Sequence, residues 1–187
     1  MEKIKRIDRS LIYKGAWISM YTDSMAFANG NFANWDFIHH NGAAAMVAED
    51  ADGKIIMIRQ WRPGAEEEIL ELPAGGINQG EEPMAAAIRE LREETGALCE
   101  TARPLLMIQP SPAYNDEKVH MFYCRVTDYA ELELDENEYV TIDRYSLEEL
   151  IGMIMAGEIS DSKTVAGLFA YKELKSKDEQ GVCFEKR

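Results

Sequence analysis

Hydrophobic and polar positions follow two different patterns along the chain. From Ser10 to Ile38 they alternate with the period of two that is typical of β-strands, and Asn29-Gly30 divides this stretch into a predicted hairpin. Residues 1–9 are charged and are expected to form a loose lead-in. A hairpin of this size buries too little apolar surface to be stable alone. We therefore expect this segment to pack on the rest of the chain or on a partner chain.

Continuous apolar runs dominate the next part of the chain. Short runs bounded by turn residues are typical of strands that are covered on both faces. The predicted strands are residues 43–49, 55–61, 69–73, 105–109, 119–126 and 138–145, with an acidic loop over 128–137. This order, with helices between and after the strands, predicts a mixed sheet with helices on both faces.

Spacing and capping signals predict three helices. The first follows Pro83 and ends before Gly96, which suits the left-handed residue past a helix end. Residues 146–149 form a capping box that opens the second helix, and Gly157 ends it. Asp161 is expected to cap the third. Apolar residues at helical spacing predict a buried stripe on the first helix: Met84, Ala87, Ile88, Leu91 and Thr95.

Composition limits the classes of protein that fit. The chain has 187 residues, 46% of them hydrophobic, which fits one ordinary domain or one domain with a small appendage. Its formal net charge of −14 disfavours a nucleic-acid partner. Neither a signal peptide nor an apolar run of about 18 residues is present, so we expect a cytoplasmic protein without a membrane partner. The three widely spaced cysteines are expected to be free thiols.

The first predicted helix carries an unfavourable cluster of like charges. Glu90 lies three and four residues before Glu93 and Glu94, so the three carboxylates share one helix face. Such pairs destabilise a bare helix by about 0.2–0.5 kcal/mol each. A divalent cation would reverse the sign, because hard cations prefer carboxylate oxygens. On these residues alone, a solvated helix face and a metal site both remain open.

The stretch that contains this helix resembles the signature of the Nudix hydrolase family. That signature is a Gly, five residues, a Glu, seven residues, and then Arg-Glu-aliphatic-any-Glu-Glu-any-Gly-aliphatic. Ala97 is smaller than the usual aliphatic residue at its position. Every fixed position is nevertheless filled: Gly75, Glu81, Arg89, Glu90, Leu91, Glu93, Glu94, Gly96 and Ala97. The flanking segments resemble the ADP-ribose pyrophosphatase branch at residues 60–62, 71–75, 111–112, 135–138 and 157–161. Hydrolases of other nucleoside diphosphate sugars share several of these segments.

The resemblance implies a fold of the α/β (α+β) class and an activity. Residues 41–187 are expected to form a Nudix α/β/α sandwich with a mixed sheet, and residues 1–40 an antiparallel β segment exchanged between the chains of a homodimer. The implied reaction is hydrolysis of ADP-ribose, an ADP-sugar, to AMP and ribose 5-phosphate with Mg²⁺, for which Mn²⁺ could substitute. Two alternatives stay open: another nucleoside diphosphate sugar such as GDP-mannose, and a non-catalytic nucleotide-sensing domain.

The resemblance also assigns roles within the signature. Glu90, Glu94 and the backbone carbonyl of Ala74 would be metal ligands, and Glu93 would join a metal or its water. Glu81 would pair with Arg89 and fix the loop onto the helix. Gly75 and Gly96 would likewise be structural.

The remaining roles fall outside the signature. The carboxylate that activates water is expected on a loop before a late strand, where Glu136 is favoured over Glu138, although the whole loop is acidic. Arg62 would bind phosphate, because its fork matches phosphate oxygens; a surface salt bridge with residues 66–68 is the alternative.

Aromatic residues are the candidates for binding the adenine. Trp17 and Trp35 would stack on the base, with the two rings coming from different chains of the dimer, or would instead pack in the core. Pro112 would help to shape the pocket for the terminal ribose.

Overall fold

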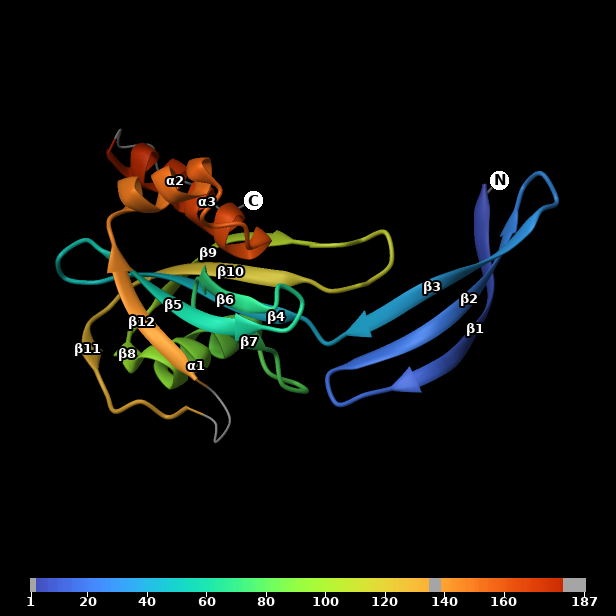
Figure 1. The fold of residues 1–187 in the computed structure, drawn as a ribbon, viewed down its shortest axis with the longest axis horizontal. Coiled ribbons are helices and arrows are strands. Elements are labelled where there is room, and N and C mark those ends of the chain that lie inside the picture. The colour runs from blue at the N-terminus through green and yellow to red at the C-terminus, as the bar shows by residue number, and fades with distance from the viewer. Residues whose placement is uncertain (1–2, 135–138, 180–187) are drawn as a thin grey trace. The chain divides into compact units, whose positions relative to one another are not determined.

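The alternating pattern at the start of the chain forms a three-stranded antiparallel sheet. The computed structural model describes residues 3–134 and 139–179, and in it these strands pair in the order β1-β2-β3 (Figure 1). The hairpin predicted at Asn29-Gly30 is present, because Gly30 has φ of 87° and its N–H donates to the carbonyl of Phe27. The strands are β1 (Ile4–Lys14), β2 (Ile18–Phe27) and β3 (Phe32–His40).

The expectation of a loose lead-in over residues 1–9 was wrong. Strand β1 begins at Ile4, opposite Phe27 on β2. Arg9 donates from Nε and Nη2 to the two carboxylate oxygens of Asp23, each at 2.6 Å, and Asp23 is only 7% exposed. Hydrogen bonding from Arg9 lowers the pKa of Asp23. Arg9 therefore pairs across the strands, although the other charged residues of β1 stay exposed.

The chain divides into two compact units. The first consists of β1, β2, β3 and the loop 109–118, and the second of the rest of the chain. The loop joins β3 through two backbone hydrogen bonds, from Ile38 N–H to the carbonyl of Tyr114 and from Asp116 N–H to the carbonyl of Ile38. His39 Nδ1 also lies 2.7 Å from Asp116 Oδ2.

The second unit is built on a seven-stranded mixed sheet of order β12-β5-β4-β10-β9, with β6 paired to β5 and β7 paired to β4. Strands β4 and β10 are parallel, and the other pairs in this sheet are antiparallel. The strands are β4 (Ala43–Glu49), β5 (Ile55–Arg62), β6 (Glu67–Glu71), β7 (Ala74–Gly76), β9 (Ala102–Ile108), β10 (Val119–Arg125) and β12 (Val140–Tyr145).

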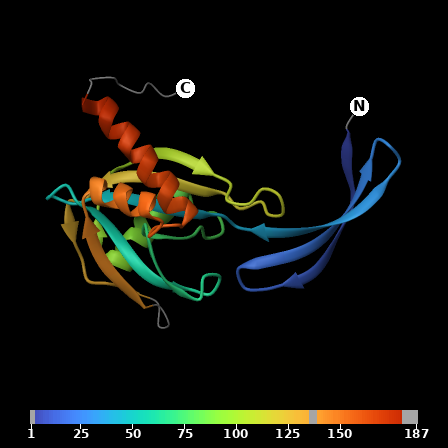
Figure 2. The same ribbon diagram turned by 45° about the horizontal axis from the view of Figure 1, so that its top comes forward.

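Helices cover both faces of this sheet (Figures 1 and 2). The described residues form three helices: α1 (Pro83–Thr95), α2 (Leu147–Ala156) and α3 (Ser162–Glu179). Alternate residues of β4 serve the two faces, because Met46 packs with α1 whereas Val47 packs with α2 and α3. The small side chains of Ala86 and Ala87 allow α1 to lie close to the sheet. The predicted mixed sheet with helices on both faces is confirmed.

The capping signals act as predicted. Gly96 ends α1 with φ of 70°, and a Cβ there would lie 2.5 Å from the carbonyl oxygen of Ala130. Ser146 and Glu149 form the reciprocal capping box of α2, and Gly157 ends that helix with φ of 79°. No helix in the described ranges is long and apolar enough to cross a membrane.

Three local predictions were wrong. The strand expected over 69–73 is instead β6, a break at Leu72-Pro73, and the short strand β7. Met84 is 43% exposed, so the buried stripe of α1 lies over Ala86, Ala87, Leu91, Glu94 and Thr95. The acidic loop contains β11 (Asp128–Tyr129), which pairs with β8 (Ala97–Leu98) after α1.

Candidate active site

The signature residues lie where β7 meets α1. Ala74 and Gly75 pair with Ala45 and Ala44 of β4, which fixes the backbone of β7 in the sheet. The N–H of Ala74 donates to Glu94 Oε2 at 2.9 Å, and Glu94 is 2% exposed. One carboxylate of α1 is thus buried and bonded to the residue whose carbonyl is a predicted metal ligand.

Glu90 lies against the glycine loop. A Cβ added to Gly75 would lie 2.2 Å from the carboxyl carbon of Glu90 and 2.3 Å from each of its oxygens. Gly75 has no positive φ. Glycine is therefore required here by the close approach of a carboxylate, not by backbone conformation.

Arg89 joins the loop to the acidic helix face. Its Nε and Nη2 donate to the two oxygens of Glu81, and Nη2 also donates to the carbonyl of Gly76. Its Nη1 donates to Glu90 at 2.7 Å and to Glu93 at 2.8 Å. These bonds raise the pKa of Arg89, and hydrogen bonding from Arg89 lowers that of Glu81. The predicted contact between Glu81 and Arg89 is present, and Arg89 Nη1 also bridges two of the predicted metal-binding glutamates.

The donor atoms at β7 and α1 are oxygens, the type of ligand that a hard divalent cation prefers. Glu90, Glu93 and Glu94 supply carboxylate oxygens, Ala74 supplies a carbonyl, and the backbone at Gly75 leaves room for the Glu90 carboxylate. Within the described part of the chain, however, no three acidic, histidine or cysteine side chains are already arranged to hold a metal. Arg89 Nη1 bonds one oxygen of Glu90 and one of Glu93, so a cation that takes both carboxylates would share them with Arg89 or replace its bonds.

Arg62, the predicted phosphate ligand, has a buried partner. Its Nε donates to Glu71 Oε1 at 2.7 Å, and Glu71 is fully buried. This ion pair takes the place of the surface salt bridge with residues 66–68 that was the alternative. The Arg62 side chain is still 37% exposed. Glu71 was not singled out from the sequence, although a glutamate in an apolar strand pattern was a signal for it.

The other predicted residues fall outside the second unit or outside the described residues. Trp17 and Trp35 belong to the first unit and are 72% and 45% exposed; Trp35 packs edge-on against Phe27. Pro112 is exposed on the loop of that same unit. Glu136 and Glu138, the candidate bases, lie outside the described residues. Their roles stay predictions.

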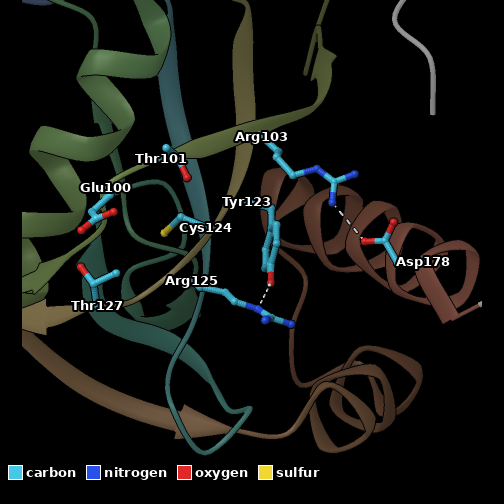
Figure 3. A pocket seen from close by; sticks show the side chains of 8 residues that line it. All are labelled: Glu100, Thr101, Arg103, Tyr123, Cys124, Arg125, Thr127 and Asp178. Carbon is cyan, nitrogen blue, oxygen red and sulfur yellow. Dashed lines mark hydrogen bonds and ion pairs between the residues drawn. The ribbon is translucent and has the colours of Figure 1, made fainter. Parts of the chain in front are cut away.

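The second unit also has a cavity at the opposite end of β4. It has a volume of about 430 Å³ and is lined by residues of β9, β10 and α3 and of their flanking loops. Figure 3 shows Tyr123, Arg125 and the ion pair of Arg103 with Asp178 around it. Tyr123 pairs in register with Val47, whereas β7 pairs with the start of β4. None of the signature residues lines this cavity.

The chain is similar to known proteins over most of its length. The chain matches the NUDIX domain over residues 39–168. It is 35% identical to the ADP-ribose pyrophosphatase of Bacillus subtilis, over 91% of this chain and 93% of that one. It is also 35% identical to the methanol dehydrogenase activator of Bacillus methanolicus, over 86% and 88% of the two chains. A solved structure of an ADP compounds hydrolase shares the fold, with a TM-score of 0.83, 22% identity and 98% coverage of both chains.

Proposed function

The chain belongs to the Nudix hydrolase family, and from this premise we propose that it hydrolyses the pyrophosphate bond of ADP-ribose to AMP and ribose 5-phosphate. The reaction class is supported by the complete signature on β7 and α1, with Glu90 against Gly75 and Glu94 on Ala74. The choice of ADP-ribose as the substrate rests on the 35% identity to an ADP-ribose pyrophosphatase over nine-tenths of both chains.

A panel of nucleoside diphosphate sugars tests the substrate. The GDP-mannose pyrophosphatase of Citrobacter koseri is 29% identical over 71% of this chain, so GDP-mannose is the matched competitor. We expect a higher kcat/KM for ADP-ribose than for GDP-mannose. Equal or reversed values would contradict the proposal, and a domain that binds these sugars without turnover would be a nucleotide sensor.

The chemistry at the site is a problem of charge. The diphosphate is anionic and gains charge as water attacks phosphorus and the P–O bond to the leaving phosphate breaks. Nudix hydrolases of this kind depend on a divalent metal, here proposed as Mg²⁺, which neutralises phosphate charge and lowers the pKa of bound water. In the proposal, Glu90, Glu93, Glu94 and the Ala74 carbonyl hold the metal. Arg62 binds phosphate, and a carboxylate outside the signature takes the proton of the water.

The identity of that base gives a prediction. A positioned general base contributes about 10²–10⁴-fold to rate. We expect Glu136→Gln to lower kcat by this order and Glu138→Gln to change it by less than about tenfold. Steady-state kinetics on ADP-ribose at saturating Mg²⁺ would compare the two variants. The reverse ranking would assign the base to Glu138.

The first unit supports the proposal of a homodimer. Its sheet exposes large apolar side chains on all three strands and at their turns, more than a solvated sheet of this size needs: Ile4, Ile7, Leu11, Ile12, Tyr13, Trp17, Ile18, Phe32 and Trp35. A second copy would cover this surface. In the proposal Trp17 and Trp35 stack on adenine, each from a different chain, and Pro112 borders the terminal ribose.

The dimer predicts a sedimentation result. Wild-type protein should sediment with twice the mass of the chain. Ile7→Asp places a charge at a side chain that is 54% exposed on β1 and should shift the equilibrium toward the monomer. Lys5→Asp on the same strand also adds negative charge but removes no apolar contact, and serves as the control. A wild-type monomer at micromolar concentration would contradict the dimer.

The thiols support a reducing compartment. Cys99 and Cys124 are free, and a hydrogen bond to Cys99 together with burial raises the pKa of Cys124. We include a cytoplasmic location in the proposal on this ground.

A further inference from the structure

The start of α3 is bonded to the segment that leads into the site. Asp161 Oδ2 accepts from the backbone N–H and from the hydroxyl of Thr164, at 3.0 and 2.7 Å. Thr164 is fully buried, and its Oγ1 accepts the N–H of Leu72 at 2.9 Å. Leu72 lies two residues before Ala74. The end of β6 is therefore held by a helix that the signature does not include.

Lys163 forms the second link between α3 and this segment. Its Nζ contacts Glu71 Oε2 and lies 3.0 Å from Asp161 Oδ2, and the side chain is only 14% exposed. Glu71 Oε1 accepts from Arg62 Nε. Each oxygen of one fully buried carboxylate thus has a different cation, Lys163 on one side and Arg62 on the other.

The contact between Arg62 and Glu71 uses one of the two carboxylate oxygens. Arginine and a carboxylate favour a bidentate pair, in which two N–H groups bond both oxygens. Lys163 Nζ bonds Oε2, whereas Arg62 bonds Glu71 through Nε to Oε1. Without Lys163, the buried anion would lose one of these two cations and would attract Arg62 more strongly. The guanidinium would turn toward Glu71 and would present less of its fork to a phosphate.

We propose that Lys163 is a positioning residue for phosphate binding: by occupying Glu71 Oε2 it keeps Arg62 in a single contact and leaves the rest of the guanidinium for the substrate diphosphate. This inference rests on the proposed function, since it takes Arg62 as the phosphate ligand. This role would account for the two cations, Arg62 and Lys163, on the fully buried Glu71 at the end of β6, just before Ala74.

The chain offers a matched control on the same helix. Lys175 Nζ bonds Glu49 Oε1 at 2.9 Å, and Glu49 is 5% exposed. Both lysines therefore tie α3 to a buried glutamate of the sheet. Glu49 lies at the end of β4 and accepts from Tyr123, which lines the cavity, whereas β7 pairs with the start of β4. Lys163→Met and Lys175→Met each remove an ion pair between α3 and a buried glutamate, and only Glu71, the partner of Lys163, also bonds Arg62.

Kinetics on ADP-ribose then separate positioning from stability. Lys163→Met should lower kcat/KM by about 10–100-fold, mainly through KM, because a displaced binding group costs this order. Lys175→Met should keep both constants at wild-type values after both variants are checked for folding by circular dichroism. In the Arg62→Met background, Lys163→Met should have no further effect. Lys163→Gln replaces the first variant if that one does not fold.

Two results would overturn the inference. One is a Lys163 variant with the same kinetic constants as Lys175→Met. The other is an undiminished effect of Lys163→Met in the Arg62→Met background, which would show that Lys163 does not act through Arg62. If wild type hydrolysed another nucleotide sugar, the proposed substrate would fail and the comparison would run on that sugar. If it hydrolysed none, calorimetric binding of ADP would replace kinetics, with weaker binding expected for Lys163→Met alone.

Discussion

Replacing Glu94 by glutamine should abolish magnesium-dependent hydrolysis of ADP-ribose while the chain stays folded. Glu94 is buried, and its Oε2 accepts the N–H of Ala74. Glutamine has nearly the same shape, and its side-chain carbonyl can accept that N–H. The variant therefore keeps the link between α1 and β7 and loses only the charge. Removing one preorganised electrostatic group from an active site costs about 10²–10³-fold in kcat, and a lost metal ligand is expected to cost at least this much.

The loss of metal affinity has its own measurement. Titration of Mn²⁺ followed by electron paramagnetic resonance should show weaker binding in Glu94→Gln than in wild type, independently of any substrate. Wild-type Mn²⁺ affinity together with wild-type turnover in the variant would remove Glu94 from the metal site.

Glu49→Gln is the matched control for this variant. Glu49 is also a buried glutamate of the second unit, but it accepts from Tyr123 and Lys175 at the other end of the sheet. Burial alone would raise the pKa of Glu49, but the hydrogen bonds from Lys175, Tyr171 and Tyr123 lower it below its usual value. A group with a lowered pKa stabilises the fold above its unfolded pKa, and this stability is lost as pH falls. We expect Glu49→Gln to lower the melting temperature at neutral pH and to leave kcat unchanged.

Short-range features of the site were predictable from the sequence. Helical spacing placed Glu90, Glu93 and Glu94 together, and α1 begins at Pro83 and ends at Gly96 as those residues indicated. Each of these inferences needs only the geometry of one helix. The sequence did not reveal that Glu94 is buried, since a carboxylate on a helix face reads as exposed until its partner on β7 is known.

Long-range partners were not predictable in the same way. Glu71 bonds Arg62, nine residues away, and Lys163, ninety-two residues away. Spacing along the chain carries no signal for a contact made when α3 packs on the sheet. Strand β1 was missed for a related reason. Its side chains are mostly exposed, as its charges suggested, and its pairing with β2, including Arg9 with Asp23, is a contact between separate strands.

Gly75→Ala should remove most of the activity with little loss of stability. The added Cβ would lie 2.2–2.3 Å from the carboxylate of Glu90, so this carboxylate must move. It is the end of a flexible side chain, and Gly75 has no positive φ, so the fold can relieve the clash by a rotation of Glu90. The rotation takes a predicted metal ligand out of place, and a displacement of about 1 Å costs up to about 10²-fold in rate.

Gly64→Ala supplies the control, because nothing lies within 4 Å of a Cβ there and its φ is not positive. Its kinetics and its Mn²⁺ affinity should match wild type, whereas Gly75→Ala should weaken both. Gly75→Ala should also be non-additive with Glu90→Ala: once the carboxylate is gone, alanine at position 75 no longer meets it and should cause no further loss of Mn²⁺ affinity. An equal loss of affinity in both backgrounds would mean that Gly75 acts through the backbone of β7 and not through Glu90.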